Sequence, residues 1–388
     1  MSVRGDFVGW IGTYLQLTIR LSWGVLVYPI SKLLGLNPVQ MGLVATFFYI
    51  GYVISSVPWG LIIDRFGPIR TMFVSSVFLA GLNLFLFFFT SYVTLLITYL
   101  IEGIVASSIF PSAMKIVSVL HGGPRLTFYV ALLESASPIT IMSISLFTGL
   151  LINFWRFFFL VMSVTFLSFA LTTLTSNVVT SPSKMRRSVS VLFKREIFLA
   201  TLLRFGELWA TWGTTTWIFY LLVIYRGFPT YVSTIFLGLF GLGQLIGIIS
   251  VEKAVNKLND MKVILISLLA FIIFSLTLTF LPENIALVDA ALLGVFSFAY
   301  RPPTDSLIMK IAGSSSAATS IGYANSISQL GTMIVPTFVG SILFLTKSFL
   351  ASIIGVNVGC VLGLVALLAL QKLVRNAYNV QKDKETRV

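Results

Sequence analysis

Charge is scarce in this chain. Only 10% of its 388 residues are charged and 57% are hydrophobic, whereas a soluble globular domain carries about 25% charged residues. The mean hydropathy is +0.98. Because a soluble core cannot enclose this much apolar surface, the composition predicts that most of the chain lies in lipid. The net charge of +13 would suggest nucleic acid in a soluble protein. Here the basic residues fall between apolar runs, so no nucleic-acid partner is expected.

Cysteine and histidine are almost absent. Cys360, the only cysteine, excludes an internal disulfide and a cysteine-based metal site, and its apolar surroundings indicate packing. His121, the only histidine, stands in the loop-like stretch "HGGPR" with no metal partner beside it. The sequence contains no phosphate-binding loop, nucleophile triad or metal-ligand cluster. We therefore expect no cofactor, no metal and no enzymatic activity.

Long apolar runs fill most of the chain. A helix needs about 20 apolar residues to cross the hydrocarbon core, and a single span can satisfy its backbone groups in lipid only as a helix. The sequence predicts twelve spans, at 8–31, 40–63, 71–90, 93–118, 126–152, 155–176, 197–224, 230–251, 262–281, 285–311, 317–345 and 348–372. The fold class is therefore predicted to be an all-α membrane protein with twelve transmembrane helices. The first run is too long for a cleaved signal peptide and carries Arg20 in its middle.

The longest polar interruption divides the spans into two sets of six. We predict an N-terminal six-helix bundle over 1–176, a cytoplasmic central loop over 177–196, a C-terminal six-helix bundle over 197–372 and a tail over 373–388. With a cytoplasmic N-terminus, 19 of the 26 Lys and Arg residues lie on the cytoplasmic side, against Lys32, Arg156, Arg226 and Lys347 on the other. Since cytoplasmic loops carry an excess of basic residues, both termini are predicted to be cytoplasmic.

The two halves of the chain resemble each other. A shift of 191 places Gly103 and Pro111 on Gly294 and Pro302, and Glu134, Ser135 and Gly149 on Asn325, Ser326 and Gly340. A shift of 192 places "DRFGPIR" (64–70) on "NKLNDMK" (256–262). Several matches at one shift predict two pseudo-symmetric halves. Secondary transporters have this architecture, with the site at the interface of the repeats near the bilayer midplane.

The stretch "GLIIDRFGPIR" (60–70) joins the second and third spans. Gly67-Pro68 predicts a turn, and Arg65 and Arg70 favour a cytoplasmic position. Asp64 is expected to face the beginning of the eleventh span at "GSSSAATS" (313–320), where a helix N-terminus favours a carboxylate by about 0.3–1 kcal/mol. That is weak enough to break during a transport cycle. The alternative interpretation is a solvated loop that only sets orientation.

This stretch resembles the loop signature of the major facilitator superfamily, in which glycine is followed by Asp-Arg/Lys-x-Gly and further basic residues. The matching residues are Gly60, Asp64, Arg65, Gly67 and Arg70, while Pro68 departs from the usual basic residue. The resemblance extends over the whole chain through the twelve spans, the central loop and the weak second copy of the motif. It implies a carrier in which this loop forms part of a cytoplasmic latch, closed in the outward-facing state.

Three stretches resemble the anion:cation symporters of that superfamily, which carry sugar acids and other organic anions, often with protons. They are "RLSWGVLVYPISKLLGLNPVQMG" (20–42), "GIVASSIFPSAMKIVS" (103–118) and, more loosely, "TWIFYL" (216–221). Arg20 stands on that family's first-span arginine. Ile19 replaces its usual aspartate, Tyr99 its fourth-span arginine and Ala106 its proton-carrying glutamate, so the family's anion chemistry transfers only in part.

Charges inside the spans are the main candidate site residues, because a charge at the bilayer centre costs about 2.5–3.5 kcal/mol even on the lenient insertion scale. Arg20 lies near the middle of the first span, and its planar fork can bind a carboxylate bidentately. Glu102 shares a helical face with Tyr99 and Ala106, so it is a candidate proton carrier in place of the missing glutamate at 106. The alternative for Glu102 is a counter-charge to Arg20.

The remaining candidates lie in later spans. Arg301 is a second candidate anion contact, and Glu134, opposite Asn325 in the repeat, either lines the cavity or braces the fifth and eighth spans. Arg204 and Glu207 are three residues apart and are interpreted first as a local ion pair, with Glu207 also a proton-coupling candidate. Asp289, Asp305, Lys115 and Lys310 lie nearer span ends, where they can reach water. The predicted substrate-binding residues are Arg20, Tyr99, Trp217, Arg301 and Asn325, and the predicted proton-coupling residues are Glu102, Glu134 and Glu207.

Together these features predict a secondary active transporter in the cell membrane that moves a small organic anion, with a carboxylate group, by alternating access and proton symport. Its expected partners are this substrate, protons and the lipid bilayer, and it is expected to be monomeric. The first alternative is a drug or metabolite exporter of the same superfamily, although "ESASPITIMSIS" (134–145) lacks the glycines expected of its fifth span. A sensor or scaffold is the other alternative, but tails of about 7 and 16 residues leave no room for a signalling domain.

Overall fold

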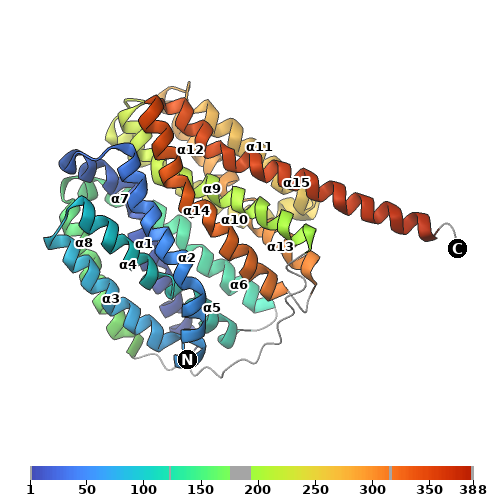
Figure 1. Ribbon diagram of the computed structural model, residues 1–388, viewed down its shortest axis with the longest axis horizontal. Coiled ribbons are helices and arrows are strands. Elements are labelled where there is room, and N and C mark those ends of the chain that lie inside the picture. Colours follow the sequence, from blue (N-terminus) through green and yellow to red (C-terminus); the bar gives the residue numbers. More distant parts are fainter. Residues whose placement is uncertain (1, 122–123, 175–193, 314–316, 386–388) are drawn as a thin grey trace.

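The computed structural model describes residues 2–121, 124–174, 194–313 and 317–385. Within these ranges every regular element is a helix, which confirms the predicted all-α membrane fold (Figure 1). The helices are α1 (Ser2–Leu34), α2 (Pro38–Phe66), α3 (Pro68–Phe88), α4 (Tyr92–Ala106), α5 (Ile109–Leu120), α6 (Pro124–Glu134), α7 (Ala136–Asn153), α8 (Trp155–Leu174), α9 (Arg195–Ile224), α10 (Thr230–Leu258), α11 (Asp260–Thr277), α12 (Glu283–Phe298), α13 (Arg301–Ala312), α14 (Ala317–Thr346) and α15 (Phe349–Glu385).

Three of the twelve spans are broken into two helices each: α4 and α5, α6 and α7, and α12 and α13. Ten helical segments in the described residues are long and apolar enough to cross a membrane. The other two spans are α1 and α9, which carry Arg20 and the pair Arg204 and Glu207 within their length. The two spans that are least apolar therefore occupy the first position of each half.

Helix ends confirm the predicted repeat at the turn of the 60–70 motif. Gly67 separates α2 from α3 with φ 87° and ψ 155°, and Asn259 separates α10 from α11 with φ 75° and ψ 163°. These two residues are equivalent under the shift of 192. A positive φ suits glycine and is tolerated by asparagine, and the Asn259 side chain also accepts a hydrogen bond from the Lys262 backbone N–H at 3.1 Å.

Close helix packing follows the same repeat. A Cβ on Gly103 would collide with the carbonyl oxygen of Phe48, and one on Gly294 would collide with that of Phe240. Thus α4 packs on α2 in the N-terminal half as α12 packs on α10 in the C-terminal half. Small residues let backbones approach this closely in membranes, where packing drives helix association.

The two bundles, α1–α8 and α9–α15, meet at the end where α2 begins and α14 ends (Figure 1). The Thr46 hydroxyl lies 2.8 Å from both the Met333 carbonyl oxygen and the Thr337 hydroxyl. The Ser145 hydroxyl donates to the Thr234 carbonyl at 2.7 Å. Within the described residues, these are the hydrogen bonds between the bundles, and all lie toward this end.

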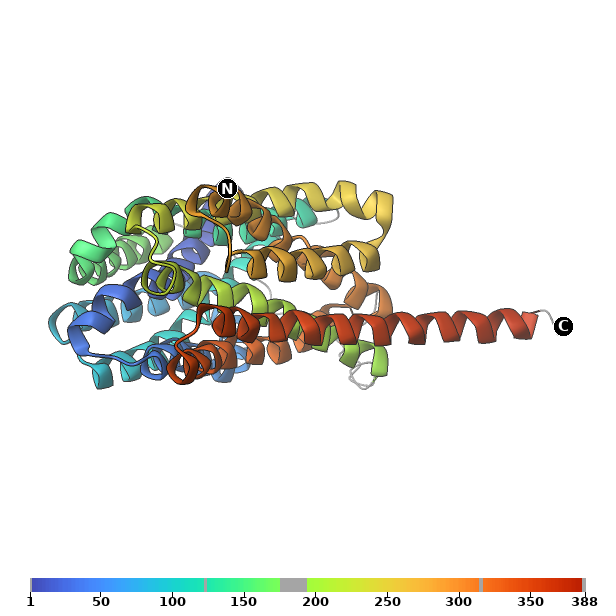
Figure 2. The same ribbon diagram turned by 90° about the horizontal axis from the view of Figure 1, so that it is seen from above.

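At the opposite end the bundles are less closely packed. Gly60 on α2 and Gly322 on α14 have no neighbouring atom within 4 Å of the place where a Cβ would stand. The structure is therefore closed at the end of the α2–α14 contact and more open at the end that carries the 60–70 motif. The backbone of α15 continues past the other helices as a straight extension (Figure 2). The predicted central loop, 177–196, lies mostly outside the described residues and stays a prediction.

Candidate functional site

A cavity of about 90 Å³ lies between the two bundles. Both bundles supply its walls, through Thr13, Gln16, Leu17, Arg20, Tyr52, Phe110, Leu133, Glu134, Ser137, Arg204, Trp212, Arg301, Asn325 and Gln329. Since a cavity needs only about 10–15 Å³ per enclosed water, it has room for several waters or a small polar ligand. Four of the predicted site residues are in its lining: Arg20, Glu134, Arg301 and Asn325.

Helix breaks place two of these charges at the cavity wall. Glu134 is the last residue of α6, separated from the start of α7 by one residue, and Arg301 is the first residue of α13. Pro302 follows Arg301 at the beginning of α13, where a missing N–H costs least. A break frees backbone groups that lipid cannot satisfy, so breaks are tolerated where they face protein or a water-filled cavity. Phe110 and Arg301, equivalent under the shift of 191, both line this cavity next to such breaks.

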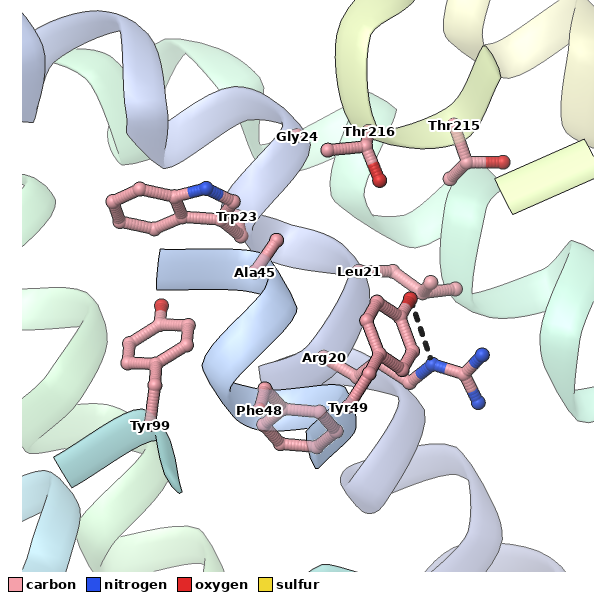
Figure 3. Close-up of a pocket in the computed structure, with 10 residues that line it drawn as sticks. All are labelled: Arg20, Leu21, Trp23, Gly24, Ala45, Phe48, Tyr49, Tyr99, Thr215 and Thr216. Atoms are coloured by element: carbon pink, nitrogen blue, oxygen red, sulfur yellow. Dashed lines mark hydrogen bonds between the residues drawn. The ribbon is translucent and has the colours of Figure 1, made fainter. Parts of the chain in front are cut away.

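Arg20 is held by aromatic rings rather than by an acid. Its guanidinium carbon lies 4.4 Å from the centre of the Trp212 ring, 4.7 Å from that of Tyr49 and 5.7 Å from that of Tyr52. Its Nε donates to the Tyr49 hydroxyl at 3.1 Å (Figure 3). Nη2 is buried without a hydrogen-bond partner, and no described carboxylate forms an ion pair with Arg20. The rings cover the faces of the cation and leave one edge free for a ligand.

A second, much smaller pocket of about 10 Å³ adjoins Arg20 (Figure 3). Tyr99 lines this pocket from α4, together with Trp23 and Gly24 of α1 and Thr215 of α9. The space suffices for about one water. The structure therefore places Tyr99 at the small pocket beside Arg20 and not in the lining of the larger cavity.

Arg204 does not form the local ion pair with Glu207 that its spacing suggests. Its guanidinium instead pairs with Asp305 on α13, and its Nη2 donates to the Asn325 side chain at 3.4 Å. Glu207 accepts a hydrogen bond from the Thr304 hydroxyl at 2.5 Å. The interpretation as a local pair is therefore wrong, because α13 packs beside α9 and offers both side chains a better partner. Asp305 was expected to reach water and instead serves as the counter-ion.

Arg301 has no ion-pair partner among the described residues. Its guanidinium carbon lies 4.7 Å from the centre of the Phe298 ring, and its buried Nε has no hydrogen-bond partner. Arg204 is close enough to interact electrostatically with Arg301, Glu207 and Glu134. Arg301 thus repeats the arrangement at Arg20, with an aromatic ring over the cation and a free donor at its edge.

Two predicted site residues lie away from the cavity. Glu102 is 1% exposed and accepts a hydrogen bond at 2.9 Å from Asn83 on α3. Residues three apart on a helix still differ by about 60° in direction, so Tyr99 faces Arg20 while Glu102 faces α3. The Trp217 indole donates to the Pro336 carbonyl at 3.0 Å, which packs α9 against α14. Neither residue contacts Arg20, so Glu102 is not its counter-charge.

The motif residues gather at the more open end. Asp64 forms an ion pair at 2.5 Å with Lys115 of α5, while Arg65 and Arg70 are exposed. Lys115 was expected to reach water and instead binds this motif. In the C-terminal half, Lys310 of α13 forms an ion pair with Asp260, the first residue of α11. Residues 314–316 of the expected partner segment of Asp64 (313–320) lie outside the described residues, so the latch contact stays a prediction.

Several cavity residues escaped the sequence analysis because they are uncharged. Gln16 Nε2, Ser137 Oγ, Trp212 Nε1 and Gln329 Oε1 are buried without a hydrogen-bond partner, and all four residues line the cavity. Buried polar atoms are normally paired, so these atoms are expected to bind water or ligand. A signal was present in the sequence, since Gln16 and Gln329 stand inside apolar runs, where polar side chains are rare.

Comparisons with known proteins agree with this fold. The family model described as "Major Facilitator Superfamily" matches residues 9–336. Among curated proteins, no sequence matches the chain. Among solved structures, it is similar to a bacterial homologue of the human lysosomal transporter Spinster in an inward-facing, unoccupied conformation, with a TM-score of 0.76 and 14% identity over 96% of this chain and 98% of that one.

The occupied inward-facing form of that homologue gives a TM-score of 0.74 with 15% identity, covering 96% of each chain. A mutant of the nucleoside transporter NupG gives a TM-score of 0.75 with 13% identity over 95% of this chain and 99% of that one. At this level of identity the likeness concerns the fold alone.

Proposed function

The chain belongs to the Major Facilitator Superfamily, and on that premise we propose that this transporter moves a small organic anion with a carboxylate group together with a proton. The narrower resemblance to the anion:cation symporters supports this substrate class through Arg20, although that family's glutamate is Ala106 here. The proposal includes a monomeric carrier in the cell membrane with both termini in the cytoplasm.

The observation that carries the proposal is the state of Arg20 and Arg301. Both guanidiniums line the cavity, both are stacked on aromatic rings, and neither has a carboxylate partner among the described residues. An unpaired cation at membrane depth is expensive, and a guanidinium edge matches a carboxylate in a bidentate contact. A substrate anion would supply the missing partner.

The charge balance around the cavity supports proton coupling. Three guanidiniums, those of Arg20, Arg204 and Arg301, line the cavity. Three carboxyl groups, those of Glu134, Glu207 and Asp305, lie on its wall or next to its lining residues. Their formal charges cancel when all are ionised. Binding a monoanion would leave a net negative charge inside the membrane, whereas binding it together with one proton keeps the empty and loaded carriers equally neutral. This balance supports a stoichiometry of one proton per monovalent anion.

Glu134 is the best-placed proton carrier of the three predicted ones. It lies on the cavity wall at the break between α6 and α7, without a hydrogen bond or ion pair in the described structure. Glu207 accepts a hydrogen bond from Thr304, and Glu102 accepts one from Asn83 away from the cavity. A carboxyl group on the wall can exchange its proton with water that enters from the open end.

The opening at the motif end corresponds to an inward-facing state if the predicted orientation holds. In that state the contact between α2 and α14 forms the closed external gate, through Thr46 and Thr337. The motif residues Gly60, Asp64, Arg65, Gly67 and Arg70 would complete a cytoplasmic latch when this end closes. Labelling a cysteine at Thr346, with Cys360 replaced by alanine, tests the orientation, since reagent must reach it from outside.

Uptake by proteoliposomes tests the function. The panel of test substrates contains sugar acids, monocarboxylates and aromatic acids. We expect a proton gradient with the acidic side outside the vesicles to drive accumulation of one of these carboxylates. Arg20→Lys and Arg301→Lys keep the charge but lose the planar fork, so each should reduce apparent affinity about tenfold or more, in line with the ~1.5–3 kcal/mol typical of charged hydrogen bonds. Arg195→Lys, an exposed arginine of α9, is the matched control. If the protein transports only neutral compounds, and neither variant changes this transport, the proposal is wrong and an exporter of uncharged molecules is favoured.

A further inference from the structure

A large apolar groove lies on the N-terminal bundle, away from the cavity between the bundles. It has a volume of about 640 Å³, within the ~300–1,000 Å³ range of ligand sites. Its walls come from α1, α7 and α8, including Tyr14 and Thr18 of α1, Phe147 of α7, and Phe157 and Thr165 of α8. Phe147 and Phe157 are each more than half exposed. All three helices belong to the transmembrane fold, so the groove opens toward lipid.

The pseudo-symmetry shows that this groove is not an unavoidable feature of the fold. In the C-terminal bundle, α9 and α15 hold the places of α1 and α8, and they close on each other through Gly206 and Gly359, where a Cβ on either would collide with the other's carbonyl oxygen. In the N-terminal bundle, Gly12 of α1 meets the ring of Phe169 on α8 rather than its backbone. Toward the α7–α8 turn the two helices leave the space that forms the groove.

The groove reaches the α7–α8 turn, where a basic residue stands. Phe154 and Phe157 line this end of the groove, and Arg156 lies between them in the sequence. Arg156 is exposed, its guanidinium carbon lies 5.2 Å from the centre of the Trp155 ring, and it forms no ion pair with a described carboxylate. Tryptophan and arginine at the end of a span are typical of the membrane interface, where lipid phosphates lie.

We propose that this groove is a specific binding site for an anionic phospholipid, whose acyl chain fills the apolar groove and whose phosphate is bound by Arg156. An extended peptide segment would bring backbone groups that need hydrogen-bond partners, and the groove walls are almost wholly apolar. A hydrocarbon chain brings no such groups. The cation at one end and the hydrocarbon-lined wall at the other match the two parts of one phospholipid.

The position of α1 gives this site a consequence for transport. One face of α1 lines the groove through Tyr14 and Thr18, and the opposite face lines the central cavity through Gln16 and Arg20. A bound acyl chain would support α1 from behind, in the place that α15 takes behind α9. Occupancy of the groove should therefore stabilise the arrangement of the cavity without contact between lipid and substrate.

Native mass spectrometry of the purified full-length protein in detergent tests the site, with phosphatidylglycerol and phosphatidylcholine titrated separately. We expect one phosphatidylglycerol to bind more tightly than phosphatidylcholine. Arg156→Gln should weaken phosphatidylglycerol binding about fivefold, the equivalent of the ~1 kcal/mol per basic residue near an anionic surface. Lys347→Gln is the matched control, because Lys347 occupies the equivalent turn of the second half under the shift of 191 and should change binding little.

A second pair of variants tests the groove itself. Thr165→Trp places a large ring in the groove and should abolish tight binding of phosphatidylglycerol, while Val164→Trp, on the neighbouring lipid-facing position outside the groove lining, should preserve it. Thermal unfolding of each variant confirms that it is folded. Equal binding of the two lipids to the wild type, an unchanged affinity in Arg156→Gln, or equal effects of the two tryptophan variants would each overturn the proposal.

Discussion

Arg204 on α9 pairs with Asp305 on α13, while Glu207, one turn further along α9, turns to Thr304 beside Asp305. Two neighbouring residues of α13 thus bind two side chains of α9. The Arg204 side chain is only 6% exposed and the Asp305 side chain 24% exposed, so this pair holds α13 in place at the wall of the central cavity. Because Arg301 is the first residue of α13, the pair also fixes the position of that unpaired cation.

Removing the acid from this pair should destabilise the protein. Asp305→Asn leaves Arg204 without a counter-ion, and we expect a loss of about 2 kcal/mol in unfolding free energy, less than the ~3–5 kcal/mol of a fully buried pair because Asp305 is partly exposed. Thermal unfolding in detergent measures it. Glu207→Gln keeps a hydrogen-bond acceptor for Thr304 and should cost less. A larger effect of Glu207→Gln than of Asp305→Asn would mean that Glu207 is the true partner of Arg204.

The helix crossings at Gly103 and Gly294 should tolerate no side chain. Gly103→Ala and Gly294→Ala would each force apart two helix backbones, at α4–α2 and α12–α10 respectively. We expect each to lower the unfolding temperature strongly or to prevent folding, since overpacking costs about 1–3 kcal/mol or more. Gly81→Ala and Gly149→Ala are controls with open space around them, and fluorescence-detected size-exclusion chromatography compares all four. Similar profiles for crossings and controls would contradict the proposed symmetric packing.

The proton carrier can be identified by comparing two glutamates. Glu134→Gln should abolish accumulation driven by a proton gradient while exchange of substrate across the membrane continues, because a permanently neutral group on the cavity wall mimics the protonated carrier. Glu102→Gln should leave accumulation nearly unchanged, since Glu102 is bound to Asn83 away from the cavity. Gradient-driven uptake and equilibrium exchange in proteoliposomes separate the two steps. Loss of accumulation in Glu102→Gln alone would return the role to Glu102.

The motif should affect the transport cycle more than stability. Asp64 is 52% exposed in its ion pair with Lys115, and exposed ion pairs contribute only about 0–1 kcal/mol. Asp64→Asn should therefore leave the unfolding temperature almost unchanged yet slow transport, through loss of the cytoplasmic latch in the outward-facing state. Lys115→Gln separates the two contacts, because it removes the observed ion pair and leaves Asp64 free for the latch. Wild-type transport rates in Asp64→Asn would reduce the motif to an orientation signal.

Sequence alone located part of the lining of the central cavity, because charge inside an apolar span is a strong signal. Arg20, Glu134, Arg301 and Asn325 all line the central cavity. It missed Gln16 and Gln329, whose uncharged side chains interrupt the apolar pattern only slightly. It also misassigned the partner of Arg204, because spacing along one helix gives no information about which neighbouring helix offers a better acid.

The sequence by itself determined the features that depend on local composition and spacing: the all-helical fold in lipid, the two related halves, the turn at Gly67, and the charges that must face the protein interior. Only the tertiary structure decided how helices rotate and which pairs approach closely. That rotation turned Glu102 toward Asn83 and away from Arg20, and left α1 apart from α8 where α9 closes on α15. The reason is physical: a rotation of about 60° separates residues three apart on a helix, and packing against several neighbours at once, which no single segment encodes, selects the direction that each side chain takes.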